Sequence, residues 1–424
     1  MSNFAADVYQ NHYLSVDGSQ VNAIVTVASA GGVEAAQQPE AAEIVIVDTS
    51  GSMYLPQTKI KGAREATSVA IDCIRDGVEF AVIAGTDHGS LVYPHEVRLV
   101  SASETTRSEA KRAVRRLKAE GGTALGSWLK LAGRLFDTAP DRVCHAILLT
   151  DGENEHETPA QLDAVLAACE GHFQCDCRGV GTDWKVSELR RIASVLLGTV
   201  DIIADPADMA ADFRSMIQTA MGKATRSVSM RVWTPQGARL AFVRQVAPTI
   251  EELTDRAVEV NALTADYPTG AWGQESRDYH LCINVQPRNI GDEMLAGRVS
   301  LVEGDELLGQ ALIKAVWTDD QQLSTKMNRE VAHYTGQEEL ADCIQDGLEA
   351  RQAGDHPTAT FKLGRAVQLA SESGNEDKMK LLQGLVEVDD AATGTVRLRR
   401  EVADVDEMAL DTRSTKTVRV RPGT

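Results

Sequence analysis

Between residues 43 and 222, short apolar runs alternate with segments whose apolar residues recur at helical spacing. The runs at 43–50, 80–85 and 144–152 have the continuous apolar character of strands buried on both faces. The segments 59–75, 103–122 and 124–136 between them show the helical period, and the Gly-Gly at 121–122 predicts the end of the second of these helices. Repeated strand and helix in this order give a mostly parallel sheet with helices on both faces. The sequence therefore predicts a Rossmann-like α/β domain over residues 41–222.

The rest of the chain follows other patterns, as expected for 424 residues, since one core rarely grows beyond about 300 residues. Short strands separated by Gly, Pro and Asp predict a β-sandwich over 223–320. Residues 1–40 contain a β-hairpin, which we assign to the same sandwich, so that the α/β domain is inserted in it. Helical spacing predicts a small bundle over 324–388, and charge clusters with few large apolar residues predict a flexible tail over 389–424.

Charge and cysteine usage narrow the possible surroundings of the protein. A formal net charge of -19 repels phosphate backbones and anionic membrane surfaces, so we expect neither a nucleic acid nor a membrane as partner. The N-terminus lacks a signal-peptide pattern, and no apolar run approaches the roughly 20 residues of a membrane span. Seven scattered cysteines suit buried thiols in a reducing compartment. We therefore expect a cytoplasmic protein.

Oxygen-bearing side chains gather at the carboxyl end of the predicted sheet. The first strand runs into Asp48, Ser50 and Ser52, whose alternate spacing directs the three side chains to one side. A Gly-Gly turn permits Thr123 to reach them, and another strand delivers Asp151 to the same edge. Carboxylate and hydroxyl oxygens suit Mg²⁺, which takes six oxygen ligands, several of them water. The pattern predicts one hard divalent cation at this edge.

These residues resemble the metal-ion-dependent adhesion site of the von Willebrand factor A family, in type and in order along the chain. The resemblance implies one Mg²⁺, with Mn²⁺ or Ca²⁺ as substitutes. The hydroxyls of Ser50, Ser52 and Thr123 would bind it directly or through water, and Asp48 and Asp151 would supply negative charge. It further implies that a partner protein offers an Asp or Glu to the remaining coordination position, and that the cation holds the two proteins together.

Enzymatic alternatives lack their motifs. A haloacid-dehalogenase-like phosphatase needs a second acid where the chain has Ser50. Neither a phosphate-binding loop nor a dinucleotide fingerprint follows the first strand, and the serines do not lie in a hydrolase G-x-S-x-G. The histidines include no H-E-x-x-H, and His88, His95, His145 and His156 are isolated in sequence. We therefore expect a protein that is not an enzyme.

The C-terminal stretch places Thr412, Thr415 and Thr417 among basic residues after an acidic run. Accessible threonines of this kind are good kinase substrates, and a phosphothreonine could dock on a forkhead-associated module. The domain order also resembles bacterial von Willebrand A proteins with a β-domain and a helical C-terminal part that act in Ser/Thr kinase signalling. The sequence thus favours a cytoplasmic, metal-dependent interaction module in a signalling complex. The alternative hypothesis is an adaptor subunit for a AAA+ ATPase remodelling or metal-insertion machine.

Overall fold

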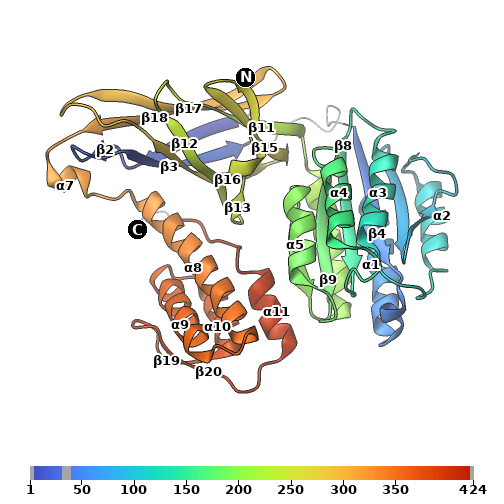
Figure 1. The fold of residues 1–424 in the computed structure, drawn as a ribbon. Coiled ribbons are helices and arrows are strands. Elements are labelled where there is room, and N and C mark those ends of the chain that lie inside the picture. Colours follow the sequence, from blue (N-terminus) through green and yellow to red (C-terminus); the bar gives the residue numbers. More distant parts are fainter. Residues whose placement is uncertain (1–3, 31–39, 421–424) are drawn as a thin grey trace. The chain divides into compact units, whose positions relative to one another are not determined.

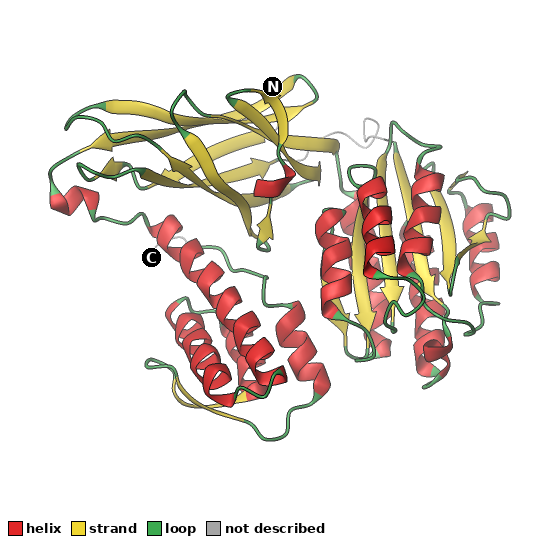
Figure 2. Ribbon diagram, in the orientation of Figure 1, coloured by secondary structure: helices red, strands yellow, loops and turns green. Residues whose placement is uncertain are grey.

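The computed structural model describes residues 4–30 and 40–420 (Figure 1). The chain divides into two compact units, one formed by residues 33–226 with 270–273 and the other by the remaining residues. The first unit is the α/β domain. The second contains the β-domain and the C-terminal helical region, and Figure 2 shows their separate strand and helix content.

The α/β unit is built on a seven-stranded sheet with the order β10-β9-β8-β4-β5-β6, and β7 pairs with β5 beside β6. Strands β4 (Ala41–Asp48), β5 (Glu79–Gly85), β8 (Val143–Thr150), β9 (Gln174–Val180) and β10 (Val200–Ile203) are parallel. Strands β6 (Gly89–Tyr93) and β7 (Val100–Ser101) are antiparallel to β5. Every residue of β4 and β8 is buried, as a strand covered on both faces requires. The predicted mostly parallel sheet is confirmed.

Helices cover both faces of this sheet (Figure 1). Alternate residues of β4 and β8 pack in one core with α1 (Thr58–Cys73), α2 (Glu104–Val114) and α6 (Met209–Met221). The other helices are α3 (Leu125–Phe136), α4 (Pro159–Cys169) and α5 (Val186–Val195). On α3, Trp128 is fully buried and lies so close to Gly85 that a Cβ there would overlap its indole ring.

The end of α2 differs from the expectation that the helix continues to the Gly-Gly at 121–122. The helix ends at Val114. Beyond it, the Glu120 N–H donates to the Thr49 carbonyl, and the Gly121 carbonyl accepts from the Gly51 N–H. These bonds hold residues 115–124 as a loop beside the end of β4, because backbone groups that serve neighbouring loops cannot also serve a helix.

Two sheets form the β-domain, and their strands are antiparallel except that β2 pairs with β18 in parallel. One has the order β1-β3-β16-β12-β13, and the other has the order β14-β15-β11-β17-β18-β2. The N-terminal strand β3 (Gln20–Ser29) pairs with β16 (Glu275–Asn284) over ten residues, so both ends of the domain contribute to one sheet. The α/β unit lies between β3 and β11 in the chain. The remaining strands are β1 (Phe4–Gln10), β2 (Tyr13–Leu14), β11 (Thr225–Trp233), β12 (Arg239–Ala247), β13 (Glu251–Glu252), β14 (Val258–Asn261), β15 (Thr264–Trp272), β17 (Glu293–Glu303) and β18 (Glu306–Trp317).

The C-terminal region consists of α7 (Gln321–Ser324), α8 (Arg329–Gln352), α9 (His356–Glu372) and α10 (Glu376–Leu385), followed by a hairpin and a last helix. Asp355 caps α9 by accepting from the Thr358 N–H at 3.2 Å, and Pro357 lies in its first turn. Gly374 follows the helix with a φ of 63°, a conformation that glycine adopts without strain. No helix within residues 4–30 and 40–420 is long and apolar enough to cross a membrane.

The prediction of a flexible tail over 389–424 is wrong for the described residues up to 420. Strand β19 (Val386–Asp390) pairs with β20 (Thr395–Leu398), and α11 (Asp404–Thr412) follows. Leu410 is fully buried in one core with residues of α8, α9 and α10. The Lys378 ammonium donates to the Ser414 carbonyl at 2.6 Å. A few apolar side chains suffice here because they fill a surface already made by three helices, which composition alone cannot reveal.

Candidate metal centre

The five predicted metal residues come from three loops at the carboxyl end of the sheet. Asp48 ends β4, and Ser50 and Ser52 lie in the short turn between β4 and α1. Thr123 lies just before α3, and Asp151 follows β8 directly. Strands β4 and β8 are parallel neighbours in the sheet, so their carboxyl ends meet at one edge.

A chain of short contacts connects these side chains. The hydroxyl oxygens of Ser50 and Ser52 lie 2.8 Å apart, and the Ser52 hydroxyl donates to Asp151 Oδ1 at 2.6 Å. A Cβ built on Gly152 would lie 3.2 Å from Thr123 Oγ1, 3.3 Å from Ser52 Oγ and 4.0 Å from Ser50 Oγ. All three hydroxyls therefore border the same small space, which only a glycine at 152 leaves open.

Asp48 stabilises the turn through the hydrogen bonds of its carboxylate. Its carboxylate is fully buried and accepts from the Ser50 N–H at 2.7 Å and from the Thr150 hydroxyl at 2.5 Å. Burial raises the pKa of Asp48 to about 6, against the effect of these hydrogen bonds. A buried carboxylate of this kind is stabilised by a nearby positive charge.

The hydroxyl of Thr123 makes no hydrogen bond with the described residues. Its backbone N–H and carbonyl both bond His156, but no hydrogen bond joins Oγ1 to any residue that the structure describes. The residue is only 5% exposed, and its hydroxyl borders the space beside Gly152 without being among the fully buried polar atoms that lack a partner. A bound cation or its water would provide a partner for this hydroxyl.

The spacing of the oxygens fits a small octahedral cation. Neighbouring ligands at about 2.1 Å from Mg²⁺ lie about 3.0 Å from each other. The separations of 2.8 Å between the serine hydroxyls and 2.6 Å between Ser52 and Asp151 are close to that value. Among the described residues no three His, Cys, Asp or Glu side chains cluster as metal ligands. A cation at this edge would therefore depend on hydroxyl oxygens.

Backbone hydrogen bonds fix the loop that carries Thr123. The N–H groups of Gly126 and Ser127 donate to the Glu157 carboxylate at 2.7 and 2.8 Å, which caps the start of α3. The Leu125 N–H donates to Asn154 at 3.0 Å. The His156 ring lies where a side chain on Gly122 would be, so this glycine permits the close approach of the two loops.

Lys59 is a member of the site that the sequence analysis missed. Its ammonium group donates to Asp151 Oδ2 at 2.7 Å and to Asp183 at 3.0 Å, and its side chain is 8% exposed. Burial works against the charged form, but the two carboxylates outweigh it and raise the pKa of Lys59. A signal was present: Lys59 stands in the first turn of a helix, where the helix dipole disfavours a cation unless a carboxylate compensates.

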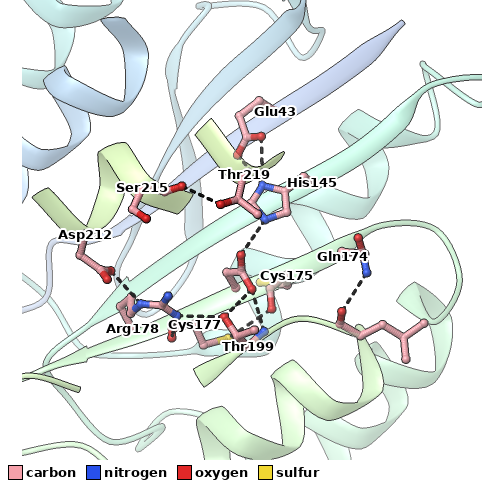
Figure 3. Close-up of polar contacts among 12 residues, drawn as sticks. Glu43, His145, Gln174, Cys175, Cys177, Arg178, Thr199, Asp212, Ser215 and Thr219 are labelled. Atoms are coloured by element: carbon pink, nitrogen blue, oxygen red, sulfur yellow. Dashed lines mark hydrogen bonds and ion pairs between the residues drawn. The ribbon is translucent and has the colours of Figure 1, made fainter. Parts of the chain in front are cut away.

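His145 is not isolated, although its sequence neighbours made it look so. Figure 3 shows its ring beside Glu43, which lies 2.9 Å from Nδ1. Asp176 lies 3.1 Å from Nε2. Burial alone would lower the pKa of His145, but the two carboxylates raise it to about 10. Glu43 and His145 are paired near the amino ends of β4 and β8, away from Asp48 at the carboxyl end. The group ties three strands together and takes no part in the candidate metal centre.

The predicted phosphorylation sites lie in ordered structure. Thr412 is 1% exposed at the end of α11. The Thr415 carbonyl accepts from the Ile250 N–H, and the Thr417 hydroxyl donates to the Val246 carbonyl at 2.6 Å. The prediction of accessible threonines on a free tail is therefore wrong for Thr412, and Thr415 and Thr417 are attached to the β-domain.

The parallel sheet, its helices and the D-x-S-x-S turn with Thr123 and Asp151 define a von Willebrand factor A-type fold. A family model for the von Willebrand factor type A domain matches residues 42–202, and one for the von Willebrand factor type A C-terminal domain matches residues 368–414. The solved structure of a von Willebrand factor type A protein from Catenulispora acidiphila is 51% identical, with a TM-score of 0.94 over 99% of this chain and 98% of that one. The chain belongs to the von Willebrand factor type A family.

More distant similarities agree with the fold. The ArnB paralog VWA2 from Sulfolobus acidocaldarius is 14% identical, with a TM-score of 0.58 over 98% of both chains. An uncharacterized protein from Synechocystis is 29% identical over 219 residues, which cover 51% of this chain and 50% of that protein. The chain thus spans about half the length of this curated relative.

Proposed function

We propose that the protein is a non-enzymatic interaction module that binds a partner protein through one divalent cation. Ser50, Ser52 and Thr123 provide hydroxyl ligands, and Asp48 and Asp151 provide negative charge. The bound cation would be Mg²⁺, or in its place Mn²⁺ or Ca²⁺. It would act as a Lewis acid, and an Asp or Glu carboxylate of the partner would coordinate it. Domains of this family are generally non-catalytic interaction modules, which supports the proposal.

The observation that carries the proposal is the common space bordered by the three hydroxyls at Gly152. Thr123 Oγ1 has no hydrogen-bond partner among the residues described, so it remains available to a cation or to its water. The adjacent Lys59 neutralises part of the charge of Asp151, so the acidic residues of the site repel a partner carboxylate less. We further propose a cytoplasmic location, which the seven unpaired cysteines support.

A matched pair of variants tests the metal. T123A removes the hydroxyl and a methyl group, while T123S removes only the methyl group. At a cation concentration 100 times the Kd, Mg²⁺ should stabilise the wild-type protein by about 2.7 kcal/mol. For a domain of this size that raises Tm by about 5 to 11 °C. We expect T123S to keep this shift relative to EDTA and T123A to lose most of it. Equal Mg²⁺ shifts in both variants would show that Thr123 is no ligand.

Capture of the partner is tested separately by pull-down from native extract with Mg²⁺ or with EDTA. We expect a protein retained by wild type and T123S but lost with T123A or EDTA. A captured kinase or forkhead-associated protein would indicate a signalling complex. A captured ATPase would indicate an adaptor role. Capture that EDTA leaves unchanged would contradict the metal mechanism.

A further inference from the structure

A cleft of about 500 Å³ lies next to the candidate metal centre. Its lining includes Thr49, which stands between Asp48 and Ser50 in the chain, and Gly121, whose carbonyl accepts from the Gly51 N–H at 2.9 Å. Residues of the segment 86–92, which joins β5 to β6 and forms most of β6, also line the cleft. A polypeptide that reaches the metal centre can therefore continue into this cleft.

The stretch that closes the cleft is strongly basic. Arg112, Arg115, Arg116 and Lys118 occur within seven residues and are all exposed. None of the four has an acidic partner among residues 4–30 and 40–420, whereas Arg107 and Lys111 on the same helix pair with Asp76 and Asp72.

Two of these cations, Arg116 and Lys118, line the cleft together with His88 and His95. The acidic residues of the lining are Asp87, which contacts His88 at 3.2 Å, and Glu120. The helix dipole favours cations in the last turn of α2, but Lys118 lies four residues beyond its end. In the lining, Arg116 and Lys118 are matched in number by Asp87 and Glu120, and the excess of cations comes from the exposed Arg112 and Arg115 in the same stretch. In a chain with a net charge of -19, this local excess of cations indicates a negatively charged ligand.

We propose that this cleft binds an acidic segment of the partner polypeptide, next to the carboxylate that the partner offers to the metal. Arg116 and Lys118 would pair with further Asp or Glu side chains and so select partners whose metal-binding acid lies in an acidic stretch. The proposal rests on the proposed function for its metal half. The cleft extends that function by adding a charge-based criterion for partner choice.

The probe is fluorescein-labelled hexaglutamate, with binding followed by anisotropy at low ionic strength in the presence of Mg²⁺. The test variant is R116S/K118S. The matched control is K130S/R134S, which removes two exposed cations of α3 that lie outside the cleft lining. We expect the test variant to bind hexaglutamate roughly fivefold to tenfold more weakly than wild type, and the control to stay within about twofold.

The outcomes separate the two proposals. Unchanged hexaglutamate affinity in R116S/K118S, or an equal loss in K130S/R134S, would overturn the cleft proposal even when Mg²⁺ still raises Tm. Absence of a Mg²⁺ effect on the wild-type Tm would overturn the metal proposal, while a selective loss in R116S/K118S would still support the cleft. Tighter binding of labelled oligothymidylate than of hexaglutamate would show that the cleft is not a site for an acidic peptide.

Discussion

The buried contact between Glu43 and His145 should make the stability of the α/β unit fall as the pH rises. The folded state raises the pKa of His145 to about 10, above its ordinary value of 6.5. Between these two values the folded protein binds a proton that the unfolded chain has released. The resulting stabilisation is fully present below pH 6.5 and is lost as the pH rises through 10. Glu43, whose pKa burial also raises, changes stability in the same direction.

The size of the effect follows from linkage. One pKa unit corresponds to about 1.4 kcal/mol, so stability should fall by about 2.5 kcal/mol between pH 7 and pH 9. The comparison variant is E43Q/H145Q, which keeps two polar side chains of similar size but removes both charges. Relative to this variant, the wild-type Tm should fall by about 5 to 11 °C over the same range.

Scanning calorimetry at pH 7, 8 and 9 measures the difference. Other groups titrate in this range, and subtracting the E43Q/H145Q profile removes their contribution. The single variant H145Q should be less stable than wild type at pH 7 by about 3 kcal/mol or more, because Glu43 then loses its buried counter-charge. Parallel Tm profiles for wild type and E43Q/H145Q would refute the reasoning, since they would mean that His145 is not held in its charged form.

Two further substitutions address the metal centre and the C-terminal segment. K59M removes the ammonium group that lies 2.7 Å from Asp151. The affinity for Mg²⁺, measured by titration, should therefore rise about tenfold or more. An unchanged affinity would mean that Lys59 does not compensate the charge of Asp151. The buried hydroxyl of Thr412 has no partner among residues 4–30 and 40–420, so T412V should leave Tm unchanged or raise it. By contrast, T412E should lower the unfolding free energy by about 2 kcal/mol or more. A wild-type Tm for T412E would contradict the packing of α11.

The approach of the five candidate metal residues to one another was predictable because the loops that follow parallel strands meet at one edge of a sheet. Asp48 and Asp151 follow neighbouring strands, and Ser50 and Ser52 follow Asp48 within four residues. Lys59 was read only as a residue of a helix, although its place in the first turn disfavours an unpaired cation. Its partner Asp151 lies 92 residues away, and that distance in sequence hides the pair.

The early end of α2 could not be predicted from its own residues, which favour a longer helix. The helix ends early because the carbonyl groups of Thr49 and Gly121 form hydrogen bonds between loops that are distant in sequence. The same bonds bring Arg116 and Lys118 to the edge of the cleft. Residues 389–420 are folded for a similar reason. Leu410 is buried because α8, α9 and α10 together form the surface on which it packs.

The sequence by itself determined the periodic order of strands and helices and the types of side chain at the strand ends, because both depend on short-range spacing. Only the tertiary structure decided which charges meet. His145 lies between Glu43 and Asp176, and Thr123 faces the serine hydroxyls, because strand pairing and loop contacts join residues that the chain separates by 30 to 100 positions. The local sequence pattern does not reveal such partners, and the charge state of a buried group such as His145 depends on them.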